Sequence, residues 1–356
     1  MNKHYTIPFF ILHKGCPFTC IFCRQDKISG KNKCSLPEDI APTIREYLKT
    51  IPRQNARVEI GFFGGSFTGL DGELQKEYLE KTRPFIKQKK IHGVRLSTRP
   101  DYINQPSLDM LKKYWVTCIE LGVQSASNRV LKKIKRGHSL NDIQKASKLI
   151  LSNNISLGHQ IMTGLPGSTL KDELNTAKLS IDMGAGEVRI YPVLVIKGTE
   201  LAEMWKKGLY KPLSESTAIR RCALLIELFE RNHVKVIRCG LHPSEGLLSG
   251  KEILDGPFHP AFRQKVETYI YKKMFKHFFE LEKDITSIKK IYYNPLDASY
   301  VLGYKRTNAD YVEKILNRKN LFEQKNKLKK GTIQILFENN KIKTITKYGF
   351  SSTGNS

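Results

Sequence analysis

The sequence predicts an α/β protein whose larger part is a partial (β/α)6 barrel of the TIM type. Short segments rich in β-branched and aromatic residues alternate with longer amphipathic segments up to about residue 200. A strand followed by a helix, repeated in series, forms a parallel sheet that always curls in the same direction. The alternation changes after residue 200, where we expect a smaller C-terminal α/β module.

The barrel elements follow in order along the chain. The expected strands, which close on Gly, Pro, Ser or Thr, are Thr6–Leu12, Val58–Phe63, Gly93–Ser97, Thr117–Val123, Ser156–Met162 and Glu187–Val193. The expected helices are Pro37–Thr50, Gly72–Lys89, Ser107–Tyr114, Ala126–Ile134, Leu140–Asn153 and Thr169–Met183. In such a barrel the functional residues lie on loops at the C-terminal ends of the strands.

The remaining chain predicts a different architecture. A helix over Ser214–Arg231 and a strand over Val234–Cys239 precede a loop rich in Gly, Pro and Ser. The module then reads as a helix (Phe262–Glu280), a strand (Ile288–Tyr293), two short helices around Gly303–Arg306, and a strand pair near Ile333–Phe337 and Lys341–Thr346. We therefore expect a barrel over 1–235, a loop segment over its mouth at 236–260, the module over 261–350 and a disordered tail over 351–356.

Charge favours a polyanionic partner. The 356 residues carry 60 Lys and Arg against 34 Asp and Glu, a net charge of +26. Such an excess attracts nucleic acid or an acidic membrane surface, although a composition rich in Lys, Asn and Ile also produces it without any binding role. No stretch approaches the ~20 apolar residues that span a bilayer, and the first apolar run, Ile7 to Leu12, is short for a signal peptide. We therefore expect a cytoplasmic protein without a membrane partner.

Three of the seven cysteines are clustered at Cys16, Cys20 and Cys23, and the other four are scattered. An odd, clustered set indicates a metal site rather than a disulfide framework. Three thiolates hold a [4Fe–4S] cluster with one iron open to a further ligand. The alternatives are a zinc site with His13 as fourth ligand, and unrelated buried cysteines.

Polar and glycine-rich segments follow the other predicted strands. Gly64 and Gly65 let backbone N–H groups approach a ligand, and Arg136 can grip a carboxylate with two parallel bonds. Each has a structural alternative: the glycines can form an ordinary turn, Gln124 can cap its own helix, and Arg136 can be a surface charge. Their joint placement after successive strands favours one shared site.

These motifs resemble the radical S-adenosylmethionine superfamily. The branch that is most similar contains oxygen-independent coproporphyrinogen III oxidase and the catalytic subunit of Elongator. The resemblance covers about residues 5–210 and rests on Cys16-Pro-Phe-Thr-Cys20-Ile-Phe-Cys23, Gly64-Gly-Ser-Phe-Thr68, Glu120-Leu-Gly-Val-Gln124-Ser125 with Lys135-Arg-Gly-His138, Gly164-Leu-Pro-Gly167, and the segment Arg189 to Thr199.

The resemblance implies a [4Fe–4S] cluster and S-adenosylmethionine as cofactors, with reductive cleavage to a 5′-deoxyadenosyl radical. It implies Cys16, Cys20 and Cys23 as metal ligands and an electron donor such as ferredoxin or flavodoxin. The cofactor-binding residues that it implies are Phe22, Gly64, Gly65, Ser66, Ser97, Gln124, Arg136, Gln160 and Val193.

Three positions depart from the family pattern. Ser66 stands where many members have Glu or Thr, Ser97 where oxidase-like members have a Glu, and Gln160 where they have an Asp. No acetyltransferase segment of the Elongator type is recognisable. The resemblance therefore predicts the cofactors and leaves the reaction open.

The C-terminal third offers candidates for substrate contact. His259 and His242 are candidates for proton transfer, and ordinary loop histidines are the alternative. The loop Gly303-Tyr-Lys305-Arg306 between two helices is faintly similar to the backbone-clamping loop of a KH domain, so Lys305 and Arg306 are candidates for nucleic-acid contact. Tyr292, Tyr293, Tyr300 and Tyr304 are candidates for base stacking, and a solvated lysine surface over core tyrosines is the alternative.

Three functions compete. The first is a radical enzyme that modifies RNA, either tRNA or rRNA. The second is a radical enzyme that acts on a small molecule such as a porphyrin or a metabolite. The third is a non-enzymatic iron–sulfur or zinc protein. The sequence leaves the substrate and the oligomeric state open.

Overall fold

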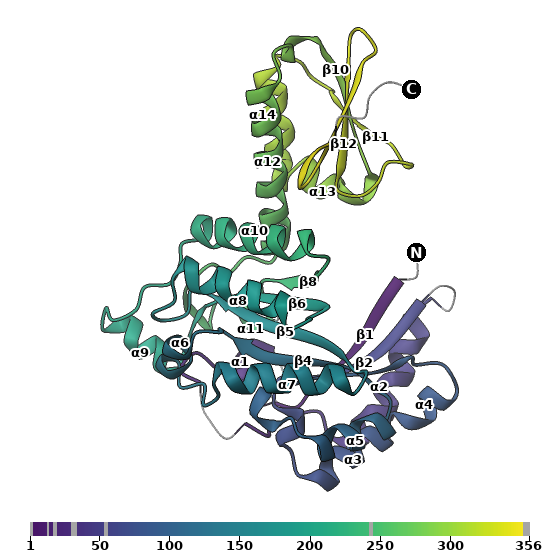
Figure 1. The fold of residues 1–356 in the computed structure, drawn as a ribbon, viewed down its shortest axis with the longest axis vertical. Coiled ribbons are helices and arrows are strands. Elements are labelled where there is room, and N and C mark those ends of the chain that lie inside the picture. The colour runs from purple at the N-terminus through teal and green to yellow at the C-terminus, as the bar shows by residue number, and fades with distance from the viewer. Residues whose placement is uncertain are drawn as a thin grey trace. The chain divides into compact units, whose positions relative to one another are not determined.

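The computed structural model describes residues 3–12, 14–16, 20–29, 34–52, 56–241 and 245–351. The chain forms two compact units (Figure 1). The first unit comprises Met1–Ala218 and Leu228–Pro260, and the second comprises Ile219–Glu227 and Ala261–Ser356.

The first unit is built on a seven-stranded parallel sheet, which confirms the predicted α/β half-barrel (Figure 1). The strands are β1 (Lys3–Phe10), β2 (Ala56–Phe63), β3 (Gly93–Thr98), β4 (Val116–Gln124), β5 (Ser156–Thr163), β6 (Glu187–Pro192) and β8 (Lys235–Cys239), in that spatial order. Each of β1 to β5 pairs with the strand that follows it in the chain, and β6 pairs with β8, which extends the six expected strands. All C-terminal strand ends therefore lie at one edge.

Helices connect these strands. They are α1 (Gln25–Ser29), α2 (Pro37–Thr50), α3 (Gly72–Glu80), α4 (Arg83–Lys87), α5 (Gln105–Lys113), α6 (Asn128–Lys133), α7 (Leu140–Ser152), α8 (Leu170–Asp182), α9 (Glu200–Lys206), α10 (Glu215–Arg231) and α11 (Glu245–Leu248). Capping boxes begin α7 at Ser139 and α8 at Thr169, where each side chain accepts from the backbone three residues on. The single helix expected over Gly72–Lys89 is two helices, because Pro84 favours a new first turn in α4.

Two short strands follow β6. β7 (Val195–Ile196) pairs in antiparallel fashion with β9 (Ile253–Asp255). Leu194, Ile196 and Leu247 form a small core, against which Ile28 of α1 packs. The loop expected over 236–260 therefore contributes structure beside the helix that follows Cys23.

The second unit packs helices against one face of a mixed sheet. Its helices are α12 (Phe262–Leu281), α13 (Ala298–Val301) and α14 (Thr307–Ile315), and its strands are β10 (Ile288–Tyr293), β11 (Phe322–Gln324), β12 (Thr332–Phe337), β13 (Ile342–Thr346) and β14 (Gly349–Ser351). The sheet order is β11-β10-β12-β13-β14, with β10 and β11 parallel. β11 and β14 were not expected, and β14 includes Ser351, the first residue of the expected tail.

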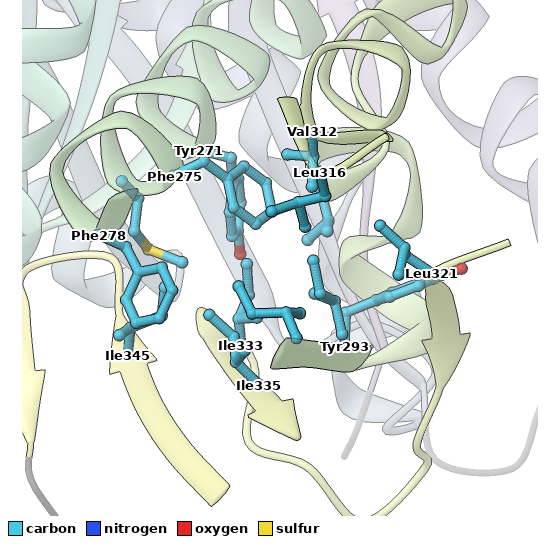
Figure 2. Packing of buried hydrophobic residues seen from close by; sticks show 14 of the residues in the cluster. Tyr271, Phe275, Phe278, Tyr293, Val312, Leu316, Leu321, Ile333, Ile335 and Ile345 are labelled. Carbon is cyan, nitrogen blue, oxygen red and sulfur yellow. The ribbon is translucent and has the colours of Figure 1, made fainter. Parts of the chain in front are cut away.

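An aromatic and aliphatic core holds this unit together (Figure 2). Tyr271 and Phe275 of α12 lie on the side of the sheet that carries Ile333 and Ile335 of β12, and Phe278 lies next to Ile345 of β13. Val312 of α14, and Leu316 directly after that helix, complete this side of the core. Tyr293 belongs to this core and is 4% exposed, so it is not available to stack on a base. No helix in the described ranges is both long and apolar enough to cross a membrane.

Candidate functional site

The cysteine loop connects β1 to α1. Cys16 is exposed, Cys23 is half-buried and Cys20 is buried, and the backbone N–H of Cys23 donates to the carbonyl of Cys20 over 3.0 Å. Burial, together with the charges of Cys20 and Cys16, raises the pKa of the Cys23 thiol to about 12. The three thiols therefore lie close enough to influence one another.

The metal assignment rests on this proximity and on the spacing of the cysteines. Among the described residues, no three His, Cys, Asp or Glu side chains are arranged as a ready-made metal site. His13, which was considered as a zinc ligand, lies outside the described residues. The cysteine spacing suits a [4Fe–4S] cluster with one open iron.

The glycine loop after β2 packs directly on the cysteine loop. A Cβ on Gly65 would lie 2.4 Å from the carbonyl of Ile11 and 2.6 Å from that of Lys14. A Cβ on Gly15 would lie 2.1 Å from the carbonyl of Ser66, and the N–H of Ser66 donates to Lys14 over 3.1 Å. Glycine is therefore required at both positions, and the two loops form one backbone platform.

The Ser66 side chain has a structural role. It is fully buried, its hydroxyl lies 2.9 Å from that of Thr98, and it accepts from the backbone N–H of Arg99 over 3.2 Å. These bonds tie the glycine loop to the end of β3. Any contact of Ser66 with a cofactor would therefore use its backbone.

Arg136 reaches from the loop after α6 to the cysteines. Its Nη1 donates to the Cys20 sulfur over 3.4 Å, and its Nη2 donates to the carbonyl of Gly122 over 2.9 Å. A Cβ on Gly122 would lie 2.5 Å from this Nη2, so glycine on β4 makes room for the guanidinium. Arg136 is thus a buried residue that links β4 to the cluster loop, and it is not a surface charge.

Gln124 ends β4 beside Arg136. Its φ of 63° lies in the left-handed region, which costs a side-chain-bearing residue about 1 kcal/mol and is often retained at functional sites. Among the described residues, the Oε1 of Gln124 and the Nε of Arg136 are buried without a hydrogen-bond partner. A ligand with a donor and an acceptor, such as the ribose and carboxylate of S-adenosylmethionine, would satisfy both atoms.

Further cations surround the cysteine loop. Burial raises the pKa of Cys16, and the charges of Arg136 and Arg99 oppose that rise. Burial, together with the same two arginines, lowers the pKa of His138 to about 3, so its ring is neutral. Positive charge at this edge of the sheet suits a ligand that carries a carboxylate.

Ser97 and Gln160, two of the departures from the family pattern, are hydrogen-bonded to each other. The Gln160 amide donates to the Ser97 hydroxyl over 2.8 Å and to the Glu120 carboxylate over 3.0 Å. The same carboxylate accepts from Arg189 and from Arg95, and Glu120 is 1% exposed. The barrel interior therefore contains a buried ion network.

The remaining predicted site residues lie elsewhere around the strand ends. Phe22 is half-buried in the cysteine loop, Val193 is 2% exposed directly after β6, and His259 is half-buried after β9. His242 lies outside the described residues. Lys305 and Arg306 are exposed and belong to the second unit.

Sequence reasoning missed three contributors to this site. Gly122 lies within the motif Glu120-Leu-Gly-Val-Gln124, but only the structure shows that it makes room for Arg136. The ion pairs of Glu120 lack a sequence signal, because its partners Arg95 and Arg189 come from other strands. Strand-end position was the signal that could have drawn attention to Arg99.

Two family descriptions match the chain. The Radical SAM superfamily matches residues 10–180, and the Radical SAM C-terminal domain matches residues 186–272. An uncharacterised protein of Methanocaldococcus jannaschii is 33% identical over 229 residues, which are 61% of this chain and 70% of that protein.

Two further relatives carry the name of an activity or of a complex. A tRNA uridine(34) acetyltransferase of Methanocaldococcus infernus is 31% identical over 194 residues, and Elongator complex protein 3 of Saccharomyces cerevisiae is 28% identical over 203. The matched part covers about half of this chain and only 36% of the length of either relative.

A solved structure agrees with these matches. The archaeal Methanocaldococcus infernus Elp3 is similar with a TM-score of 0.60 and 26% identity, over 77% of this chain and 64% of that one. The fold, the strand-end site and these matches together lead to one conclusion. The chain belongs to the radical S-adenosylmethionine superfamily and is an enzyme whose cofactors are a [4Fe–4S] cluster and S-adenosylmethionine.

Proposed function

We propose that this enzyme cleaves S-adenosylmethionine reductively and uses the resulting 5′-deoxyadenosyl radical to modify RNA, with tRNA as the favoured substrate. The observation that carries the first half is the contact of Arg136 with Cys20, combined with the unpaired Nε of Arg136 beside Gln124. The contact joins the cysteine loop to the residues that would hold the methionine carboxylate. The [4Fe–4S] cluster supplies the electron for the cleavage.

Each residue has a role in this proposal. Cys16, Cys20 and Cys23 hold the cluster, with Phe22 packed beside the adenine. Gly64 and Gly65 present backbone N–H groups, Arg136 grips the carboxylate, and Gln124 binds the ribose. Ser66 contributes through its backbone, and Val193 lines the site from the end of β6. A ferredoxin or flavodoxin would be the reductant.

Ser97 and Gln160 have a different role from that of the acidic residues at these positions in the oxidase-like members. Their hydrogen bond leaves a neutral pair next to the Glu120 carboxylate. An acid at either position would place a second negative charge near Glu120. Because the pair is neutral, it adds no negative charge beside Glu120, and the cofactor or substrate meets uncharged groups.

The RNA half of the proposal draws on two observations. The relatives named above include tRNA uridine(34) acetyltransferases and Elongator complex protein 3. This chain carries a net charge of +26, which favours a polyanionic substrate. Since the match covers only about a third of those proteins, the acetyltransferase activity that one of the names states is not part of the proposal.

The test of radical chemistry is anaerobic. The protein is reconstituted with iron and sulfide, reduced with dithionite and given S-adenosylmethionine, and 5′-deoxyadenosine is measured by chromatography. The unchanged protein should release it, and Cys20→Ala should bind little iron and release none. Cys239→Ala, which removes a buried thiol from β8, is the matched control and should behave as the parent. Equal product from Cys20→Ala would overturn the proposal.

The test of the substrate compares nucleosides. Total RNA from cells with and without the gene is digested and analysed by mass spectrometry. Loss of one modified nucleoside, restored by the intact gene but not by the Cys20→Ala gene, supports RNA modification. An unchanged profile together with normal 5′-deoxyadenosine release would instead favour a small-molecule substrate.

A further inference from the structure

The second unit carries a surface of lysine and tyrosine side chains on α12, on α14 and on the turn Tyr304–Arg306 that precedes α14. The Lys265 ammonium lies 5.3 Å from the centre of the Tyr304 ring, and the Lys272 ammonium lies 5.1 Å from that of Tyr311. Lys305 approaches Tyr304 as well, at 5.8 Å. We name Lys265, Lys272, Tyr304, Lys305 and Tyr311 the Lys–Tyr ladder.

The two rungs of the ladder are the pairs Lys265–Tyr304 and Lys272–Tyr311. Lys265 and Lys272 are seven residues apart on α12, where seven residues rise by about 10 Å. Tyr304, in the turn before α14, and Tyr311, on α14, are also seven residues apart in the chain. Because the partners follow the same order in both segments, the helices run in the same direction and each lysine meets a tyrosine of its neighbour.

Buried hydrogen bonds fix the two helices between the rungs. The Asn308 amide donates to the carbonyl of Thr268 over 2.9 Å, and the Tyr304 N–H donates to the Thr268 hydroxyl over 3.0 Å. Asn308 is fully buried and Thr268 is 8% exposed. The ladder therefore stands on a rigid base, and a ring that holds a lysine reduces the side-chain entropy lost on binding.

More positive charge continues along both helices. Lys276 is exposed one turn beyond Lys272, and Lys314 is exposed three residues beyond Tyr311. From residue 261 to residue 351 the chain has 20 Lys and Arg against 9 Asp and Glu. The carboxylate of Asp310, near the ladder, lies 3.8 Å from the Nε of Arg306. It therefore pairs with an arginine outside the ladder.

The backbone before α14 is unusual at the same place. Lys305 and Arg306 have φ values of 52° and 61°, in the left-handed region that favours glycine. Gly303 has a φ of 81°, and a Cβ there would lie 2.9 Å from the N–H of Asn308. Strained backbone of this kind persists where surrounding structure holds it and often accompanies function. Here it exposes Lys305 at the end of the ladder.

We propose that the Lys–Tyr ladder, with Lys276 and Lys314, binds the phosphate backbone of the RNA substrate. The proposal rests on the proposed RNA function, and it extends the contact from the Gly303–Arg306 loop to the lysines of α12 and to α14. Ammonium groups at fixed intervals neutralise phosphates, and the tyrosines hold them in place. An anionic membrane would also attract lysines, but a membrane-binding helix carries large apolar side chains on its buried face. The ladder itself presents lysine and tyrosine side chains.

The test measures binding of the full-length protein to bulk tRNA by fluorescence anisotropy between 50 and 300 mM salt. The variant Lys265→Ala/Lys272→Ala/Lys276→Ala removes three ammonium groups from α12. The control Lys327→Ala/Lys329→Ala/Lys330→Ala removes the same charge from the exposed loop between β11 and β12. The α12 variant should bind at least about 10-fold more weakly and lower the magnitude of the salt slope by about 2 to 3, and the control should change affinity by less than about 2-fold.

Three results would overturn the ladder proposal: no tRNA binding by the parent protein, equal losses in the two triple variants, or retained tRNA binding with lost binding to phosphatidylserine vesicles. A Tyr311→Phe variant keeps the ring under Lys272 and should bind as the parent, whereas Tyr311→Ala should weaken binding. Thermal melting identifies a variant that fails to fold. Binding is measured without the radical reaction, so an unchanged RNA nucleoside profile with intact binding would refute the proposed function and leave the ladder standing.

Discussion

Gln160 donates a hydrogen bond of 2.8 Å from its side-chain amide to the hydroxyl of Ser97, across the sheet from β5 to β3. Glu120, on β4 between them, accepts a second bond from the same amide nitrogen. A carboxylate can only accept, so this contact also assigns the amide orientation. Two positions that depart separately from the family pattern thus form one unit, in which an amide replaces an acid beside a buried carboxylate.

The charge of Glu120 should matter more to stability than the hydrogen bonds of Gln160. Glu120→Gln leaves Arg95 and Arg189 without their shared carboxylate in the barrel interior. Removing one partner of a buried ion pair costs about 3–5 kcal/mol, whereas Gln160→Met, which removes two bonds and no charge, should cost about 1–3 kcal/mol. Urea denaturation at pH 7 measures both free energies of unfolding.

The order of these two costs is the critical result. If Gln160→Met destabilised the protein as much as Glu120→Gln, the charge balance would not be what holds the network. Exposed Glu46 on α2 is the control, since Glu46→Gln should change the free energy of unfolding by less than about 0.5 kcal/mol.

Gly122 should determine whether Arg136 reaches its position. The Cβ of Gly122→Ala would lie 2.5 Å from Arg136 Nη2, so the guanidinium must move away from the Gly122 carbonyl and from Cys20. We expect affinity for S-adenosylmethionine to fall by about 10-fold, as for loss of one charge-assisted contact. Equilibrium dialysis with labelled S-adenosylmethionine, normalised to bound iron, measures the change.

Gly72→Ala is the matched control for a methyl group added at glycine. Nothing lies within 4 Å of a Cβ at that position, which is the first residue of α3. The variant should bind S-adenosylmethionine as the parent does, and its stability should rise by a few tenths of a kcal/mol at most. Unchanged affinity in Gly122→Ala would show that Arg136 does not need this space.

The elements of the barrel could be predicted because periodicity and strand-end residues carry local information. The strands, the cysteine spacing and the glycine loop all follow from neighbouring residues, and their order fixes a parallel sheet. The break between α3 and α4 was missed, although Pro84 signals it. Short strands such as β11 and β14 depend on pairing partners and have little local signal.

Site residues could be predicted from the sequence only where they lie within a recognisable motif. Arg136 and Gln124 were predicted as cofactor contacts from their motif, but the need for Gly122 depends on a contact across 14 residues. Ser66 stays a predicted cofactor contact through its backbone, and the bond of its hydroxyl to Thr98, 32 residues away, has no signal in the sequence. The Lys–Tyr ladder joins residues 39 positions apart, so the sequence pointed only to the half of it near Lys305.

Acid should weaken the barrel through Glu59. Burial raises the pKa of this carboxyl, but hydrogen bonds from His4 and Arg57 and the charge of Arg95 outweigh it and hold the pKa at about 2. A carboxyl whose pKa is lower in the folded state stabilises the protein above its ordinary value of 4.5, and loses that contribution as pH falls from 4.5 toward 2.

The comparison of Glu59→Gln with the parent isolates this contribution. The variant should be about 3 kcal/mol less stable at pH 7, and the difference should shrink as pH falls below 4.5. Urea denaturation at several pH values measures it. A difference that stays constant down to pH 2.5 would mean that the ionised form of Glu59 adds no stability, despite its three basic partners.

The two nitrogen contacts of Arg136 make its replacement by lysine the sharpest test of the cofactor site. Lysine keeps the charge but is a single point donor, so it cannot bond Cys20, Gly122 and a ligand carboxylate together. Arg136→Lys should therefore lower affinity for S-adenosylmethionine by about 10- to 100-fold at equal bound iron. Arg129→Lys, in the exposed pair with Asp172 on the neighbouring helix, is the control and should bind normally.

If Arg136→Lys bound S-adenosylmethionine as the parent does, the guanidinium of Arg136 would serve the cysteine loop alone. Another cation would then have to hold the carboxylate of the ligand, and the buried Arg99 near Cys16 is the candidate.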